Sequence, residues 1–134
     1  MVRGYKLILS VLVALLVAFG LGYAWGRSGR VEAEQAASQA GQQIDLAQAR
    51  GLVLDARVSL YNQNFGDAQR QLDDAKAPLT RARDRAQADG GTARAQQLSS
   101  ALAKIDEAKR LASRLDPSAN NQAGEAIKAM DAAK

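Results

Sequence analysis

Residues 7–25 read LILSVLVALLVAFGLGYAW and carry no charged side chain, and basic residues stand on both sides of the stretch. A helix of about 20 apolar residues is long enough to cross the roughly 30 Å hydrocarbon layer of a membrane. The stretch therefore predicts a retained transmembrane anchor. The alternative is a secretory signal peptide, whose apolar core is usually about 7 to 15 residues long and ends in a small-x-small cleavage site. Residues 22–24 and 24–26 are weak sites of that kind.

Aromatic and basic residues lie at both ends of the anchor. Tyrosine and tryptophan favour the membrane–water interface because one edge of the ring stays hydrated there, and Lys and Arg meet anionic headgroups at the same depth. We therefore expect the lipid bilayer to be a partner of the chain. The expected interface residues are Tyr5, Lys6, Tyr23, Trp25, Arg27 and Arg30.

The charges that flank the anchor give a nearly balanced orientation signal, with Arg3 and Lys6 before it and Arg27 and Arg30 after it. A short tail such as residues 1–6 is typical of a signal anchor whose N-terminus stays in the cytoplasm. We therefore expect the following domain to be periplasmic. The alanine, glutamine and arginine content favours a bacterial source and hence an inner-membrane location.

Small side chains form a row along one face of the anchor helix, because residues four apart in a helix share a face. Such small-xxx-small rows let a second transmembrane helix approach closely. The alternative is that the row faces lipid. The row predicts packing against other transmembrane helices through Ser10, Ala14, Ala18, Gly22 and Gly26.

Charge and composition exclude several classes of function. Residues 1–30 hold four of the 18 basic side chains and none of the 14 acidic ones, which leaves 14 bases and 14 acids in the rest of the chain. A neutral domain lacks the basic surface of a nucleic-acid-binding protein. The chain has no Cys and no His, and therefore lacks the usual nucleophiles, bases and ligands of catalytic, zinc, haem and iron–sulfur sites. We expect no enzyme activity, no cofactor and no metal site.

Residues 31–134 predict one small all-α domain of three or four helices with a thin, alanine-rich core. Residues 26–30, between the anchor and this domain, are either a hinge or a continuation of the anchor helix. The first of these helices should end at the turn residues 62–67. Its apolar residues recur at alternating spacings of three and four, as in a coiled coil that pairs with a neighbour or with a second copy. This seam comprises Ala37, Ala40, Ile44, Ala47, Gly51, Leu54, Val58 and Tyr61, and Leu46, Val53 and Leu60 form a second row for another neighbour.

The remaining sequence predicts three further amphipathic helices, separated by turns at residues 89–91 and 116–118. Pro78 should kink or briefly break the second helix, because proline removes a backbone donor. The faces expected to be buried are Ala68, Leu72, Ala75, Leu79, Ala82 and Ala86 in the second helix, Ala95, Leu98, Leu102, Ile105, Ala108, Ala112 and Leu115 in the third, and Ala123, Ile127 and Met130 in the last.

Residues 50–77 resemble a single helical hairpin of the tetratricopeptide-repeat family. The resemblance rests on Phe65 followed by Ala68, Leu72 and Ala75, because in that family an aromatic residue precedes a helix with a small, large and small residue at this spacing. No second copy follows at a period of about 34 residues, and several repeats are needed to build the family's concave groove. The resemblance therefore implies a helical hairpin and not a peptide-binding groove.

Two groups of side chains are candidates for partner contacts. Tyr61 and Phe65 flank an asparagine-rich turn, where they either plug the end of the bundle or contact a ligand or partner. Arg81, Arg83 and Arg85 either form a solvated face or dock to an acidic partner or to lipid headgroups.

These features together predict a single-pass membrane protein that acts as a non-catalytic accessory or scaffold subunit of a larger integral membrane complex, for example a photosynthetic or respiratory one. Other transmembrane helices would then be its partners. The alternatives are a self-associating, membrane-anchored coiled coil that forms a homo-oligomer, and a helical binding protein that is cleaved and secreted.

Overall fold

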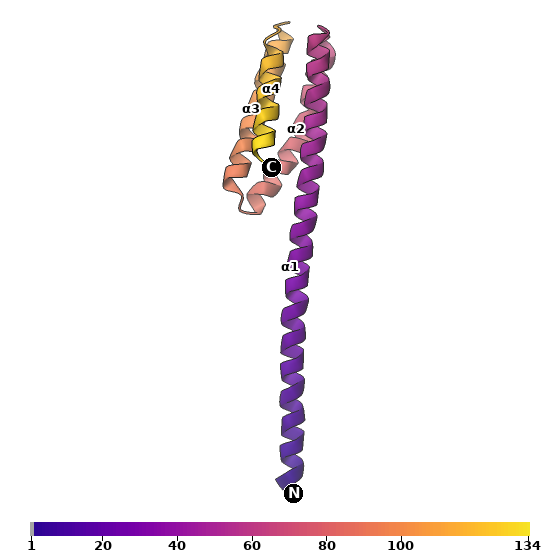
Figure 1. Ribbon diagram of the computed structural model, residues 1–134, viewed down its shortest axis with the longest axis vertical. Coiled ribbons are helices and arrows are strands. Elements are labelled where there is room, and N and C mark those ends of the chain that lie inside the picture. Colours follow the sequence, from indigo (N-terminus) through magenta and orange to yellow (C-terminus); the bar gives the residue numbers. More distant parts are fainter. Residues whose placement is uncertain (1) are drawn as a thin grey trace. The chain divides into compact units, whose positions relative to one another are not determined.

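The computed structural model describes the backbone of residues 2–134 and the side chains of residues 8–134. It contains four helices, α1 (Val2–Tyr61), α2 (Phe65–Ala88), α3 (Thr92–Ser113) and α4 (Ala119–Ala132), and the described residues include no strand (Figure 1). The prediction of an all-α protein with an apolar N-terminal helix and a small helical bundle is confirmed. The chain divides into two units, residues 1–37 and residues 38–134.

The first unit is helical throughout its described part, and the helix continues through residues 26–30. From Ile8 onward it holds an 18-residue window with a mean hydropathy of 2.2, and none of this window is buried. The helix is therefore long and apolar enough for a single membrane span. A signal sequence near an N-terminus would satisfy the same criterion.

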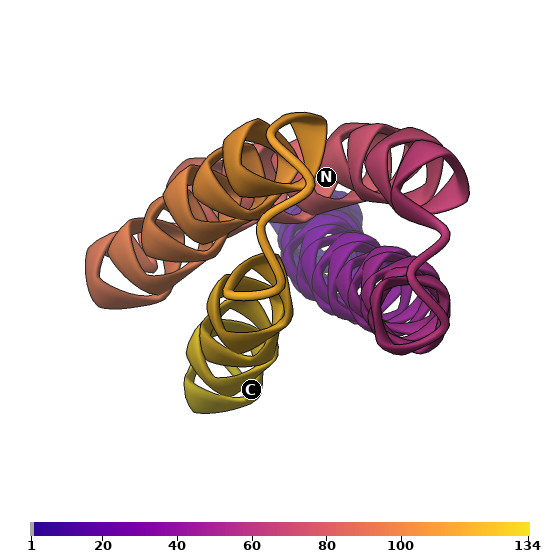
Figure 2. The ribbon, with the colours of Figure 1, turned by 90° about the horizontal axis from the view of Figure 1, so that it is seen from above.

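The second unit is a bundle of four helices formed by residues 38–61 of α1 together with α2, α3 and α4. Consecutive helices run in opposite directions, α2 packs on α3 and α3 packs on α4 (Figure 2). Short turns between antiparallel neighbours give the up-down-up-down order of a simple helical bundle. The core is rich in alanine, as the sequence predicts, and its largest fully buried side chains are Leu72, Leu79, Leu98, Ile105, Met130 and Val53.

The predicted inner faces of α2 and α4 are confirmed, since all the residues expected to be buried on them are buried. In α3 the expected face is buried except for Leu102, which is half-buried, and Leu115, which lies beyond the end of the helix and is 67% exposed. Pro78 is buried, and α2 continues through it without a break. The prediction of a break at this residue is therefore wrong, because the buried residues on both sides of the proline hold the two halves of the helix in the core and offset the lost backbone hydrogen bond.

α1 packs on the bundle through its second apolar row and not through the seam with alternating spacings. The second apolar row, Leu46, Val53 and Leu60, lies in the core with Ala49 and Ala56 between its members. The seam with alternating spacings of three and four faces away from the bundle and is exposed at most of its positions. An apolar periodicity marks a face that is suited to burial, but with two such faces it does not determine which one the bundle uses.

All three turns between helices close in the same way. The amide three residues after the last residue of each helix donates to a carbonyl five residues back, as in Asn64 to Ser59 (2.8 Å), Gly91 to Ala86 (2.8 Å) and Asp116 to Leu111 (3.0 Å). This is the Schellman arrangement, which places one residue in the left-handed region. Those residues are Gln63 (φ 59°), Gly90 (φ 78°) and Leu115 (φ 57°).

Candidate interaction surfaces

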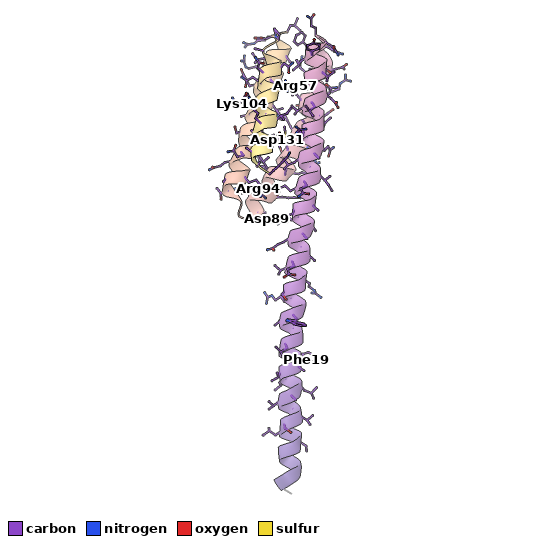
Figure 3. The ribbon with its side chains drawn as sticks, viewed as in Figure 1. Phe19, Arg57, Asp89, Arg94, Lys104 and Asp131 are labelled. Atoms are coloured by element: carbon purple, nitrogen blue, oxygen red, sulfur yellow. The ribbon has the colours of Figure 1, made fainter. Side chains whose placement is uncertain are left out.

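The predicted packing row of the apolar helix lies on open helical surface. Ser10, Ala14, Ala18, Gly22 and Gly26 are all exposed, and a Cβ added at either glycine would meet no atom within 4 Å. The large apolar side chains around the row are exposed as well, as Phe19 illustrates at 81% (Figure 3). An apolar helix that is uncovered on every side needs lipid or other helices around it.

Three of the expected interface residues gather at the C-terminal end of this row. Tyr23, Arg27 and Arg30 line a hollow of about 350 Å³ together with Gly22 and Gly26. Trp25 projects from the same stretch and is 85% exposed. Tyr5 and Lys6, the expected interface residues at the other end, lie outside the described side chains.

A buried carboxylate joins α1 to α2 in the second unit. Asp45 is only 5% exposed, and both of its oxygens accept from arginines one turn apart on α2. The Nε of Arg81 donates to Oδ1 at 3.1 Å, and Nη1 of Arg85 donates to Oδ2. A buried charge is costly without partners of opposite charge, so this cluster favours the pairing of α1 and α2 that brings Asp45 to both arginines.

Gly41 is the residue that gives Arg85 room to reach Asp45. A Cβ at position 41 would lie 2.7 Å from Nη1 and 2.9 Å from Cζ of Arg85. The guanidinium therefore lies against the backbone of α1, one turn before the carboxylate that it binds. The sequence gives no direct signal of this cluster, because its members lie 36 and 40 residues apart along the chain.

The three arginines predicted as partner contacts are all engaged within the chain. Arg81 and Arg85 bind Asp45, and Arg83 binds its neighbour Asp84 at 2.7 Å. Tyr61 is 83% exposed, whereas Phe65 is half-buried and packs against the core. Of the two aromatic residues at this turn, Tyr61 is therefore the one with free surface.

Ion pairs on the surface link α2 to α3. Nζ of Lys109 donates to Asp73 at 2.6 Å, and this hydrogen bond lowers the pKa of the Asp73 carboxyl. Nζ of Lys76 lies 2.8 Å from Oδ1 of Asp106, and the hydrogen bond between them raises the pKa of Lys76. Each exposed pair of this kind contributes little to stability. The two pairs join the same helices, with the lysine on α3 in one pair and on α2 in the other.

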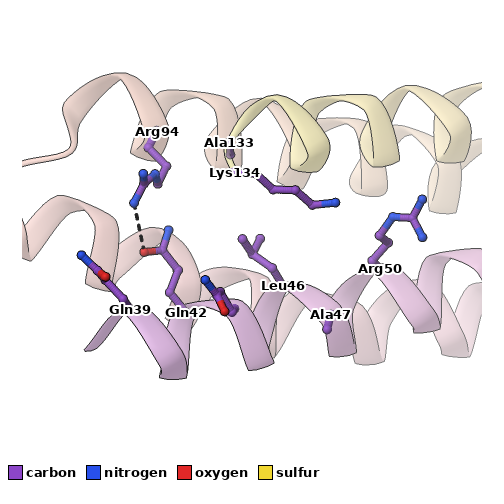
Figure 4. Close-up of a pocket in the computed structure, with 9 residues that line it drawn as sticks. Gln39, Gln42, Leu46, Ala47, Arg50, Arg94, Ala133 and Lys134 are labelled. Carbon is purple, nitrogen blue, oxygen red and sulfur yellow. Dashed lines mark hydrogen bonds between the residues drawn. The ribbon is translucent and has the colours of Figure 1, made fainter. Parts of the chain in front are cut away.

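A cavity of about 510 Å³ lies at one end of the bundle, where Gln42 and Leu46 of α1 face Arg94 of α3 (Figure 4). Nη1 of Arg94 lies 3.5 Å from the amide oxygen of Gln42. The other two cations of the lining, Arg50 and Lys134, both lie beside Asp131, with their nitrogens at 3.3 and 2.8 Å from Oδ1. The hydrogen bond from Lys134 lowers the pKa of Asp131, so this carboxylate offsets the positive charge of the lining.

The outward seam of α1 forms a continuous apolar surface on the second unit, which we call the outer stripe. It contains the largest exposed apolar side chains of this unit apart from Leu115, with Ile44 at 67%, Val58 at 61% and Leu54 at 37% exposed. Single exposed apolar residues are ordinary on protein surfaces, but a contiguous row along about six helical turns is typical of an interaction surface. The outer stripe consists of Ala40, Ile44, Ala47, Gly51, Leu54, Val58 and Tyr61.

No protein-family model matches the chain, and no curated protein or solved structure matches it either. The resemblance of residues 50–77 to a tetratricopeptide repeat therefore rests on the hairpin pattern alone.

Proposed function

We propose that the chain is a single-pass membrane protein that acts as a non-catalytic accessory or scaffold subunit of a larger integral membrane complex. The observation that carries the proposal is the uncovered apolar helix of residues 8–25, along which Ala18 and Gly22 belong to an open row of small side chains. Transmembrane helices associate through close van der Waals packing, and small residues allow that approach.

In this proposal the anchor is retained in a bacterial inner membrane and the four-helix unit lies in the periplasm. In this orientation Tyr23, Trp25, Arg27 and Arg30 would lie at the outer membrane–water interface. The neutral charge of the residues after position 30 suits contacts with protein surfaces better than contacts with nucleic acid. The four-helix unit would hold extramembrane surfaces of the complex or recruit a soluble partner.

The test is extraction of native membranes with mild detergent, separation by size, and mass spectrometry of the proteins that migrate with the chain. We expect migration with one large integral complex, and weaker migration for Ala18→Leu and Gly22→Leu because a larger side chain separates the helices. Ala24→Leu is the matched control, since Ala24 is also exposed but lies on the opposite side of the helix from Gly22. Migration of the chain alone, or equal effects of all three changes, would refute docking through this row.

The same membranes distinguish an anchor from a signal peptide. Intact-mass measurement of the native protein should give the full-length chain, because the anchor is retained. A mass lower by about 24 to 26 residues would show cleavage after the apolar stretch and would establish the secreted alternative instead.

A further inference from the structure

We propose that the outer stripe is a dimerisation surface whose occupant is the outer stripe of a second copy, with the two α1 segments parallel and in register. The inference specifies a partner for the four-helix unit, and its parallel sense rests on the proposed anchoring of both copies in one membrane. Two copies inserted in the same orientation emerge on the same side, so their corresponding residues leave the bilayer at the same level.

The spacing of the outer stripe fits this occupant. Ile44, Gly51 and Val58 repeat at intervals of seven, and Ala40, Ala47, Leu54 and Tyr61 repeat at the same interval between them. These are the a and d positions of a two-stranded coiled coil, and β-branched residues at a with leucine at d favour two parallel strands. The small Ala47 and Gly51 in the middle allow the two backbones to approach closely.

The charges beside the outer stripe favour the parallel arrangement. In a parallel pair each g residue meets the e residue five positions later in the partner, which brings Arg50 of one copy to Asp55 of the other, and Arg57 to Asn62. In an antiparallel pair centred on the stripe near Gly51, g residues meet g residues, and Arg50 of one copy would meet Arg50 of the other. The charge pattern is thus complementary in one orientation and repulsive in the other.

The groups needed for this contact are accessible in the structure. Asp55 is exposed, and the side chain of Arg50 is 41% exposed beside its partner in α4, Asp131. The opposite face of α1 is occupied by the bundle core, in which Val53 and Ala56 are completely buried. A second copy can therefore cover the outer stripe without displacing the core, and only the side chain of Arg50 would turn from Asp131 toward Asp55 of the second copy.

The absence of cysteine from the chain makes a direct test possible. Single cysteines are introduced as Ile44→Cys and Val58→Cys in the full chain, which is reconstituted in phosphatidylcholine vesicles and treated with a short bifunctional maleimide. Parallel pairing predicts that each variant crosslinks to itself. Antiparallel pairing predicts no self-crosslinking and a crosslinked product only when the two variants are mixed, because positions 44 and 58 lie symmetrically about Gly51. That outcome would overturn the proposal, as would crosslinking no greater than that of Ala103→Cys, an exposed position on α3.

Charge variants give an independent readout of the same contact. Ile44→Lys should weaken dimerisation by about tenfold or more, whereas Leu115→Lys, at an equally exposed residue outside the stripe, should leave it unchanged. Asp55→Arg should weaken self-crosslinking at position 44, and the combination Arg50→Asp with Asp55→Arg should restore it. A lack of restoration would refute the proposed register.

The outcome is separable from that of the proposed function. If the chain migrates with a larger complex through its anchor but does not crosslink to itself, the second copy is refuted and the accessory role stands. If native membranes instead give a crosslink from position 44 to a different polypeptide, the outer stripe belongs to that partner and the dimer is likewise refuted.

Discussion

Removal of the two arginines that bind Asp45 should be one of the most destabilising surface changes in the four-helix unit. We consider Arg81→Met with Arg85→Met, because methionine keeps the apolar part of each side chain over α1 and removes only the charge. The carboxylate is 5% exposed and would lose both of its partners. Breaking a buried ion pair from one side costs about 3 to 5 kcal/mol, and we expect the free energy of unfolding to fall by that amount.

The same reasoning predicts a rescue. When Asp45→Leu is added to the two methionines, no buried charge remains and the three apolar side chains can pack together. Replacing a buried ion cluster by apolar residues of similar volume is often neutral or stabilising. The triple variant should therefore recover most of the stability that the double variant loses. Asp45→Leu alone should cost less than the double variant, because the arginines are 50% and 40% exposed and can return to water.

The assay is urea unfolding of the full chain in detergent, followed by far-ultraviolet circular dichroism. The matched control is Arg83→Met, whose guanidinium binds the exposed Asp84 on the same helix, and it should change the free energy of unfolding by less than about 1 kcal/mol. A double variant as stable as this control would show that Asp45 is accessible to water. A triple variant no more stable than the double would refute the argument that the loss arises from an unpartnered carboxylate.

Three further predictions concern single residues and pH. Leu115→Gly should raise the free energy of unfolding in urea by about 1 kcal/mol, because Leu115 is left-handed (φ 57°) and exposed. Gly51→Ala should raise the free energy of unfolding by about 1 kcal/mol through helix propensity, because the added Cβ meets no other atom. Gly41→Ala should be nearly neutral, because the added Cβ would lie 2.7 Å from Nη1 of Arg85 and displace that guanidinium from Asp45. In a pH series of urea unfolding, the pKa of Asp73 lies below 3.8 in the folded chain, so its contribution to stability is complete above pH 3.8 and is lost as the pH falls through the folded value. The pKa of Lys76 lies above 10.5, so its contribution is complete below pH 10.5 and is lost as the pH rises through the folded value. Asp73→Asn should reduce the acid-side loss in part, because the pKa values of Glu107, Asp116, Glu125 and Asp131 are lowered as well, and it should leave most of the alkaline-side loss, which depends chiefly on Asp106.

Most of the fold follows from local sequence patterns. The inner face of α2 is predictable because Ala68, Leu72, Ala75 and Leu79 repeat at helical spacing and no competing apolar face exists on that helix. The turn after α2 is predictable as well, because Gly90 is the residue best suited to a left-handed conformation.

Other features depend on contacts that no local pattern records. Gln63 and Leu115 occupy left-handed positions for which neither residue type is favoured, so the packing of the helices on both sides must hold them there. The burial of Asp45 depends on arginines that follow it by 36 and 40 residues, and hydrophobic periodicity places a carboxylate on the outside of a helix. This polar cluster is one reason why the inner face of α1 is difficult to recognise from the sequence.

The two faces of α1 in the four-helix unit differ in a way that supports a partner for the outer stripe. The inner face buries Leu46, Val53 and Leu60 together with small alanines, whereas the outer face leaves Ile44, Val58 and Tyr61 exposed. Burial of apolar surface contributes about 25 cal/mol per Å², so a partner that covers these exposed side chains would stabilise the protein further. The bundle holds α1 through its inner row and through the ion cluster of Asp45, and the outer apolar side chains remain available. That distribution is expected when the outer face is covered by another helix, and the crosslinking of positions 44 and 58 determines whether that helix is a second α1.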